Sequence, residues 1–239
     1  MTRLAVVVFP GSNCEHDVVA ALGVVGIDST LVWHTEADLG GADGVVLPGG
    51  YAHGDYLRPG AIARFSPIMA AVSDLAQAGG PVIGICNGFQ VLTEAGLLPG
   101  ALRRNAGLRF LCQTTRLRVV TTRSALTNRC ENGQLLELPI NHNEGNFTCD
   151  KGTLRRLIDN DQIVLSYVDN PNGSVGDIAG ICSEGRNVVG LMPHPERASS
   201  ALLGSLDGLA LLRSLTNQPA SSLSLGDEPG ATARFAAAN

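Results

Sequence analysis

The stretch "GGPVIGICNGFQVLTEAG", residues 79–96, joins an apolar run to an amphipathic segment through a single cysteine. Residues 82–85 form a short apolar run after Gly-Gly-Pro, which is typical of a buried strand. Apolar side chains then recur at helical spacing, at Phe89, Val91, Leu92 and Ala95. The pattern predicts a core strand followed at once by a helix, with Cys86 on the corner between them.

This corner has the form G-x-C-x-G, in which Gly84 and Gly88 flank the cysteine. A nucleophile on such a strained turn needs small residues two positions before and after it, so that strand and helix can pass closely. The positive end of the helix then favours a thiolate at Cys86. A buried structural cysteine between two ordinary glycines is the alternative, and the corner alone does not decide between them.

A second segment, "NVVGLMPHPERA" at residues 187–198, offers a general base. Pro193 and Pro195 exclude a helix around His194 and favour an extended conformation. Residues i and i+2 of an extended segment point to the same side, so Glu196 is expected beside His194. A carboxylate there can hold the imidazole while its other nitrogen serves a nucleophile. The alternative is a surface turn, which the presence of a corner cysteine makes less attractive.

A third segment, "VVLPGGYAHGDYLRPGA" at residues 45–61, ends a predicted core strand in Pro48-Gly49-Gly50. Glycines directly after a strand let backbone N–H groups approach a ligand closely, as an oxyanion hole requires. The N–H of Asn87, the residue after the cysteine, would supply a second donor. A plain turn is the alternative for this segment.

The order of elements predicts an α/β fold, a three-layer αβα sandwich with a mainly parallel central sheet plus a small additional sheet. Predicted strands and helices alternate through the first hundred residues. The strands are expected at 4–9, 29–34, 44–50 and 81–86, and the helices at 15–25 and 61–78. From about residue 108 the runs are mostly strand-like, and a helix at 207–215 closes the domain. Residues 1–217 are predicted to form one domain, and 218–239 a flexible tail, because the tail is rich in Ser, Ala, Gly and Pro.

Composition excludes several function classes. A net charge of −5 argues against nucleic acid as a partner. No stretch resembles a membrane span or a signal sequence, so a cytoplasmic location is expected. The six cysteines contain no C-x-x-C pair, so no metal site is predicted and most are expected to be buried apolar residues. The chain has one lysine, Lys151, and no G-x-x-x-x-G-K-[ST] loop for a nucleotide.

The chain resembles the class I (triad) glutamine amidotransferases, which have a flavodoxin-like fold. The G-x-C-x-G corner and His-Pro-Glu are shared by that whole class. Further blocks resemble the glutaminase subunits of phosphoribosylformylglycinamidine synthase, from the fourth step of purine biosynthesis. These blocks are "FPGSNC", "GDYLRPGAIA", "GICNGFQVLTEAGLLPGAL", "NPNGSVGDIAGI" and "GLMPHPER". They cover the chain from near residue 4 to about 215.

The resemblance implies a role for each matching residue. It makes Cys86 the nucleophile and completes a triad with His194 and Glu196. Gly50 and Asn87 match the backbone oxyanion donors, and Gln90 matches a residue that helps to hold the amino-acid end of glutamine. This chain departs from the family pattern in three places. They are "GGYAHGD", which contains His53, "HNEG" (142–145), which contains Asn143, and "YVDNPNGS" (167–174), which is shorter than in many relatives.

The resemblance also implies partners. Glutamine is the expected substrate, and the ammonia would pass to an ATP-dependent large subunit of formylglycinamidine synthase, joined in many bacteria by a small third protein. ATP and Mg²⁺ would be used by that partner, with no cofactor in this chain. Three alternatives stay open: a stand-alone cysteine hydrolase or peptidase of related fold, a glutaminase subunit serving another amidotransferase pathway, and a regulatory module that keeps the triad as a relic.

Overall fold

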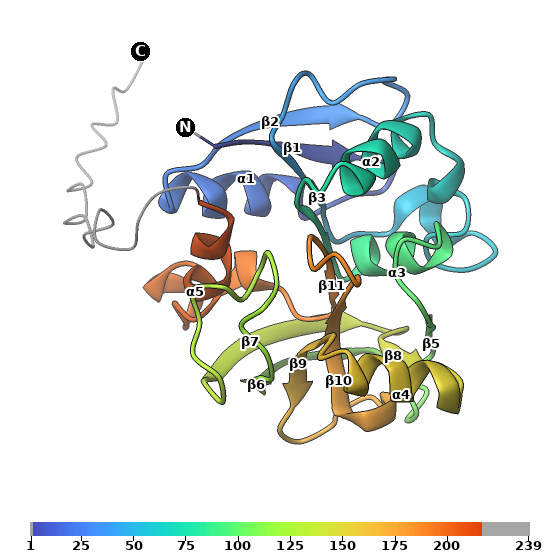
Figure 1. Cartoon of the computed structure of the whole chain (residues 1–239), viewed down its shortest axis with the longest axis vertical. Coiled ribbons are helices and arrows are strands. Elements are labelled where there is room, and N and C mark those ends of the chain that lie inside the picture. Colours follow the sequence, from blue (N-terminus) through green and yellow to red (C-terminus); the bar gives the residue numbers. More distant parts are fainter. Residues whose placement is uncertain (1, 217–239) are drawn as a thin grey trace, which may run out of the picture.

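The computed structural model describes residues 2–216 and is built on a nine-stranded mixed sheet with the strand order β2-β1-β3-β4-β11-β10-β9-β6-β7 (Figure 1). The strands of this sheet are β1 (Arg3–Val8), β2 (Asp28–Trp33), β3 (Gly44–Leu47), β4 (Val82–Ile85), β6 (Leu111–Val119), β7 (Leu135–His142), β9 (Ile163–Tyr167), β10 (Ile178–Cys182) and β11 (Val188–Leu191). A separate two-stranded sheet pairs β5 (Ala101–Arg103) with β8 (Asn146–Thr148). The predicted main sheet and small additional sheet are both confirmed.

The first half of the main sheet is parallel. β1 pairs with β2 and β3, β3 pairs with β4, and β4 pairs with β11, all in the parallel sense. Every residue of β3, β4 and β11 is buried, which explains why these strands read as continuous apolar runs. Since carboxyl ends of parallel strands meet at one edge of the sheet, the residues that follow β3, β4 and β11 come together there.

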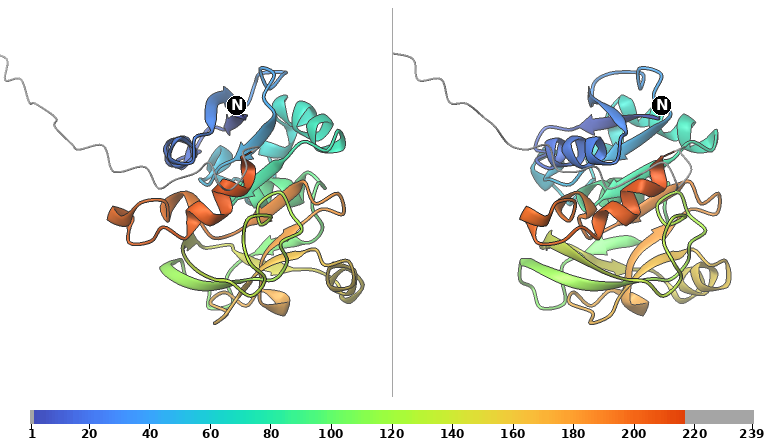
Figure 2. Two further views of the ribbon diagram at one scale, coloured as in Figure 1. Left: turned by 60° about the vertical axis from the view of Figure 1, so that its left-hand side comes forward. Right: turned by 90° about the vertical axis from the view of Figure 1, so that its left-hand side faces the viewer.

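Helices cover both faces of this parallel half, as expected for the sandwich. They are α1 (Glu15–Val24), α2 (Ile68–Gln77), α3 (Asn87–Glu94) and α5 (Gly208–Leu212), whereas α4 (Lys151–Asp159) lies at the antiparallel half (Figure 1). In Figure 2, α1 and α5 lie on one side of the parallel strands and α2 and α3 on the other. The apolar residues predicted to face the core from α3, Phe89, Val91 and Leu92, are fully buried.

The second half of the main sheet is antiparallel, with β10, β9, β6 and β7 added in turn beyond β11. Helix α4 follows β8 in a region where the sequence predicts mostly strands, so the structure differs from the expectation there. Its core contribution is small: Thr153 and Leu157 are its buried residues. The local signal is its N-cap, since Asp150 accepts a hydrogen bond from the Thr153 N–H.

The predicted helix at 61–78 is only partly correct. Residues Ala63–Phe65 form a 3₁₀ turn, and α2 begins at Ile68. Ser66 precedes Pro67 and is extended, with ψ 140°. A proline restricts the residue before it to extended backbone, which ends the first segment and lets a new helix begin after Pro67.

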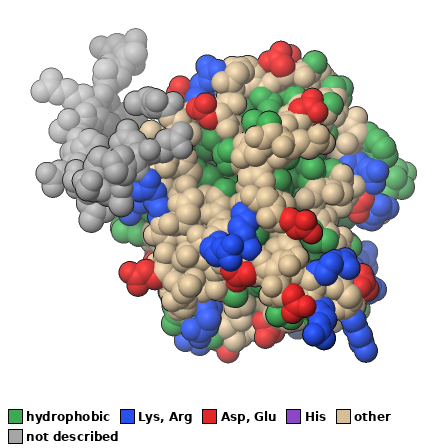
Figure 3. Space-filling view, in the orientation of Figure 1, with side chains coloured by type: hydrophobic (Ala, Val, Ile, Leu, Met, Phe, Trp, Pro, Cys, Tyr) green, Lys and Arg blue, Asp and Glu red, His purple; other side chains and the backbone are tan. Residues whose placement is uncertain are grey.

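The predicted tail at 218–239 lies outside the residues that the structure describes. None of the helices within residues 2–216 is both long and apolar enough to cross a membrane. On the face drawn in Figure 3, arginine and carboxylate side chains are interspersed over the antiparallel half.

Candidate active site

Cys86 occupies the corner between β4 and α3 in a left-handed backbone conformation, with φ 50° and ψ −104°. This conformation is strained for any residue other than glycine. The corner is tight, because a Cβ on Gly84 would lie 2.7 Å from the Gly88 carbonyl carbon. The Cys86 N–H donates to Leu191 O at 2.7 Å, which ties the corner to the end of β11. The geometry is that of a nucleophile elbow, as the sequence predicts.

His194 and Glu196 follow β11 and form a buried pair. His194 Nδ1 lies 2.6 Å from Glu196 Oε1, and each residue is 1% exposed. Glu196 reaches the imidazole from a 3₁₀ turn, Pro195–Arg197, rather than from the extended segment that the sequence predicts. Proline at the first position of the turn favours it, because the ring fixes φ near the helical value. The juxtaposition is confirmed although the local backbone differs.

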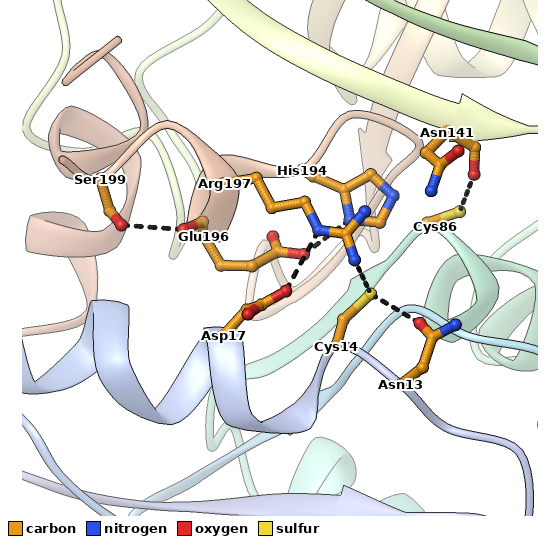
Figure 4. A network of polar contacts seen from close by, with 9 residues as sticks. All are labelled: Asn13, Cys14, Asp17, Cys86, Asn141, His194, Glu196, Arg197 and Ser199. Atoms are coloured by element: carbon orange, nitrogen blue, oxygen red, sulfur yellow. Dashed lines mark hydrogen bonds and ion pairs between the residues drawn. The ribbon is translucent and has the colours of Figure 1, made fainter. Parts of the chain in front are cut away.

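The His194 imidazole has neighbours that favour its charged form. Burial alone would lower the pKa of His194, but the charges of Glu196 and Cys86 outweigh burial and raise the pKa well above its ordinary value. Figure 4 shows the imidazole between the Glu196 carboxylate and the Cys86 sulfur. His194 Nε2 has no hydrogen-bond partner within residues 2–216, so it is open to a group in the site.

Gly50 and Asn87 flank the same site. Gly50 has φ 148°, and a Cβ there would lie 2.7 Å from Ser12 Cα, so only glycine fits. Asn87 is the first residue of α3, where a backbone N–H has no partner within the helix. Its side chain ties the two segments together, since the Ala52 N–H donates to Asn87 Oδ1 at 3.0 Å. The two expected oxyanion donors therefore stand on connected segments next to Cys86.

The side chain of Gln90 is held on both sides by the protein. Its Nε2 donates to Glu144 O at 2.6 Å, and its Oε1 accepts from Asn87 Nδ2 at 2.8 Å. Gln90 lines one pocket together with Gly50, Cys86 and His194. The structure thus brings four of the six predicted residues to one cavity, while Asn87 and Glu196 lie directly behind it.

The same pocket is lined by further residues for which no role is predicted from the sequence: Asn13, Cys14, Tyr51, Asp55, Asn141, His142, Asn143 and Glu144. Most of them belong to the segments "FPGSNC", "GDYLRPG" and "HNEG", but nothing in the sequence shows that these three segments meet in one pocket. Asp55 lies on the loop after Gly50. Burial raises the pKa of Asp55 to about 6, helped by the charge of Glu144 and opposed by the hydrogen bond from Asn87. The two carboxylates give this end of the pocket a negative character.

Cys14, which also lines the pocket, and Arg197 lie beside the pair of His194 and Glu196. Arg197 donates to Cys14 Sγ and to Asp17 Oδ2, each at 3.2 Å (Figure 4). Donor atoms of Cys14, His194 and Glu196 lie within 4.8 Å of one another, a spacing that a metal ion could use. His194 Nδ1 and Glu196 Oε1 are bonded to each other, however, which favours a proton-sharing pair over a metal centre. All six cysteines are free, and Cys14, Cys86 and Cys182 are buried while Cys112 is exposed.

Comparison with known proteins identifies the family. A family model described as a CobB/CobQ-like glutamine amidotransferase domain matches residues 1–207. The phosphoribosylformylglycinamidine synthase subunit PurQ of Rubrobacter xylanophilus is 58% identical, over 89% of this chain and 97% of the relative. The PurQ subunit of Synechococcus elongatus is 54% identical, over 89% of this chain and 97% of that relative. The chain belongs to the PurQ family of glutamine amidotransferases.

A solved structure supports the same family. The structure of PurLQS from Thermotoga maritima contains a chain that superposes with a TM-score of 0.83 at 40% identity, covering 90% of this chain and 97% of the other. The predicted fold and the resemblance are both confirmed by this match. The His194–Glu196 pair and the corner at Cys86 lie next to each other in the structure, at the residues for which the sequence predicts a triad.

Proposed function

We propose that this chain hydrolyses glutamine to glutamate and ammonia with Cys86 as nucleophile and His194 and Glu196 as the rest of a triad. The observation that carries the proposal is the arrangement of Cys86 on a strained corner, facing an imidazole whose other nitrogen is bonded to a buried carboxylate. Such a corner exposes a thiolate to the pocket, and the carboxylate fixes the imidazole so that Nε2 can exchange a proton there.

In the proposed reaction, the Cys86 thiolate attacks the side-chain carboxamide carbon of glutamine. The backbone N–H groups of Gly50 and Asn87 hold the oxyanion that forms. His194 then protonates the departing nitrogen, which leaves as ammonia. Water, deprotonated by His194, hydrolyses the remaining glutamyl thioester and releases glutamate, while Glu196 stabilises the cationic imidazole.

The far end of the pocket suits the amino-acid part of glutamine. Asp55 and the Glu144 segment bring negative charge there, which attracts the α-ammonium group. Gln90 lines the pocket together with Asp55 and Cys86, and its side chain is held by Asn87 and by Glu144 O. We assign Gln90 to substrate positioning on that ground.

The ammonia would pass to an ATP-dependent partner that converts formylglycinamide ribonucleotide to formylglycinamidine ribonucleotide. Relatives at more than half identity are named as PurQ subunits of this synthase, and the Thermotoga structure is of PurLQS. The partner is then a PurL-type large subunit, with a small third subunit, in the cytoplasm. The ATP and Mg²⁺ chemistry belongs to the partner, since this sequence carries no nucleotide-binding loop.

The loop after Gly50 is suited to connect that partner with the oxyanion site. His53, Asp55 and Leu57 all have positive φ, between 51° and 71°, and Tyr56 and Leu57 are 71% and 79% exposed. Asn87 holds the beginning of the loop, and Glu94 holds its end through two contacts of 2.6 Å to Arg58. We propose that docking on this loop orders the oxyanion donors, so that the chain alone is a weak glutaminase.

Assays that compare this chain alone with the chain plus its own PurL and PurS partners test the proposal. We expect ammonia release from glutamine that rises when partner, ATP and acceptor are present. Release of ammonia without any gain from these partners, but with gain from a different synthetase, would favour another amidotransferase pathway. Cleavage of peptides without glutamine hydrolysis would favour a stand-alone cysteine peptidase.

A further inference from the structure

A second histidine, His142, lines the pocket beside Cys86, and the proposed reaction gives it no task. It is the last residue of β7, and it is 3% exposed. Its ring fills the space that a side chain on Gly145 would take, since a Cβ there would lie 2.6 Å from His142 Nε2. The ring is therefore confined between its own strand and the backbone at Gly145.

The neighbouring Asn105 determines which ring nitrogen of His142 carries a proton. Asn105 Nδ2 donates to two carbonyl oxygens, those of Arg109 and His142, each at 2.9 Å. Both hydrogens of the amide are used in this way, which fixes the amide orientation. Its oxygen must then face the other side, where it accepts from the Gly145 N–H at 3.1 Å.

That oxygen also lies 3.1 Å from His142 Nδ1. An amide oxygen only accepts hydrogen bonds, so Nδ1 must be the protonated nitrogen. Burial, together with the charge of His194, lowers the pKa of His142 to about 4, so the ring is neutral at physiological pH. Nε2 consequently carries a lone pair and no proton.

His142 Nε2 is buried and has no hydrogen-bond partner within residues 2–216. A buried acceptor without a donor is unfavourable, so this atom is suited to a ligand that brings an N–H group into the pocket. Resting on the proposed function, we propose that His142 Nε2 accepts a hydrogen bond from the side-chain carboxamide N–H of glutamine, and that this bond selects glutamine over glutamate.

Glutamine has a second nitrogen, the α-ammonium, but the surroundings of His142 favour the carboxamide. Cys86 Sγ lies 3.7 Å from the carbonyl oxygen of Asn141, the residue before His142 in β7, so this end of β7 lies at the reacting end of the pocket. Asp55 and Glu144 also line the pocket, and their carboxylates attract the α-ammonium group, so His142 is not required to bind it. A glutamate side chain would turn a lone pair toward the lone pair of Nε2, which disfavours the product at this position.

The test compares two substrates in the complete complex, glutamine and the γ-methyl ester of glutamate. The ester keeps the α-ammonium and the acyl carbon but has no N–H on its leaving group. His142→Phe removes the acceptor, and His16→Phe on the exposed face of α1 is the matched control. We expect kcat/KM for glutamine to fall about 100-fold and that for the ester to change less than about threefold. Inhibition by glutamate should tighten in the same variant.

Equal losses for both substrates in a folded variant would assign His142 to the α-ammonium or to structure and overturn the proposal. No loss for either substrate would overturn it too. His142→Met fills similar space without an acceptor at Nε2 and provides the same comparison if the phenylalanine variant does not fold, as judged by its thermal unfolding. If the parent complex itself fails to release ammonia from glutamine, the proposed function fails instead, so the two failures are distinguishable.

Discussion

Glu196 Oε1 lies 2.6 Å from His194 Nδ1, and both side chains are withdrawn from solvent. The pair is held from behind by its own backbone turn, since the Ser199 hydroxyl donates to Glu196 O at 2.8 Å. Because the imidazole is tied at one nitrogen, its other nitrogen is directed toward Cys86 (Figure 4). Because Cys86, His194 and Glu196 contact one another in this order, replacing each one tests a separate proposed role.

Replacing the carboxylate should affect the chemical step more than substrate binding. In Glu196→Gln the amide can still contact Nδ1, but no charge stabilises the imidazolium, so the pKa of His194 falls. We expect kcat for glutamine hydrolysis to drop about 10³-fold or more, with KM within about threefold of the parent. Steady-state assays measure both. Glu184→Gln, on an exposed loop, is the control. A large rise in KM with unchanged kcat would contradict this role.

Gly50 should tolerate no side chain. In Gly50→Ala a Cβ would meet Ser12 Cα at 2.7 Å in a backbone conformation that L residues rarely adopt. We expect a loss of about 3 kcal/mol of unfolding free energy and about 100-fold in glutaminase rate. Gly79→Ala separates strain from crowding, because Gly79 has φ 86° but nothing within 4 Å of its Cβ. The control Gly79→Ala should lower the unfolding free energy by about 1–2 kcal/mol and leave the glutaminase rate unchanged. Chemical unfolding and glutaminase assays provide the two readouts.

The raised pKa of Asp55 predicts that the free energy of unfolding changes between about pH 4 and pH 6. Burial raises its pKa from 3.8 to about 6, so the folded protein holds a proton that the unfolded chain has released. Stability from this group is therefore present below pH 4 and is lost as pH rises through 6. Since the carboxyl is partly open to solvent, we expect the free energy of unfolding to change by only about 1 kcal/mol over this range. Asp55→Asn should remove this part of the pH dependence in unfolding curves, whereas the exposed Asp74→Asn should not.

The Arg58–Glu94 pair tests the proposed link to the partner. The Arg58 side chain is 62% exposed, so breaking the pair should cost at most about 1 kcal/mol of stability. In Arg58→Ala we nevertheless expect activation by the partner to fall several-fold, because the end of the loop is released from α3. Arg116→Ala, which breaks another exposed pair with Asp169, is the control. Unchanged activation in Arg58→Ala would remove the loop from the mechanism.

Continuous apolar runs made the parallel half of the fold predictable. Strands such as β4 and β11 are buried on both faces, so their sequences carry few polar residues and are easy to recognise. Helix α4 was missed for the opposite reason, because only Thr153 and Leu157 are buried and its sequence is mostly polar. The single helix predicted across Pro67 is wrong, because apolar side chains keep helical spacing on both sides of a proline that breaks the helix.

The residues of the proposed triad could be singled out from the sequence because each follows a core strand in a short motif. The pocket wall was not, since Asn13, Asp55 and His142 come from three distant segments that meet only when the sheet forms. No spacing in the sequence relates Asn105 to His142 either, although their hydrogen bond determines the protonation of the imidazole. The sequence thus indicates the proposed reacting groups and Gln90, whereas the other residues of the pocket wall, His142 among them, come together only in the structure.

The central claim is that Cys86 supplies ammonia to chemistry carried out on another chain. Cys86→Ala in the assembled complex tests it, with Cys112→Ala as a control at an exposed cysteine. Formation of formylglycinamidine ribonucleotide is measured with glutamine and, separately, with an ammonium salt as nitrogen source. The account predicts that the glutamine-dependent rate disappears while the ammonium-dependent rate stays near that of the parent. Retention of the glutamine-dependent rate, or loss of both rates in an intact complex, would contradict it.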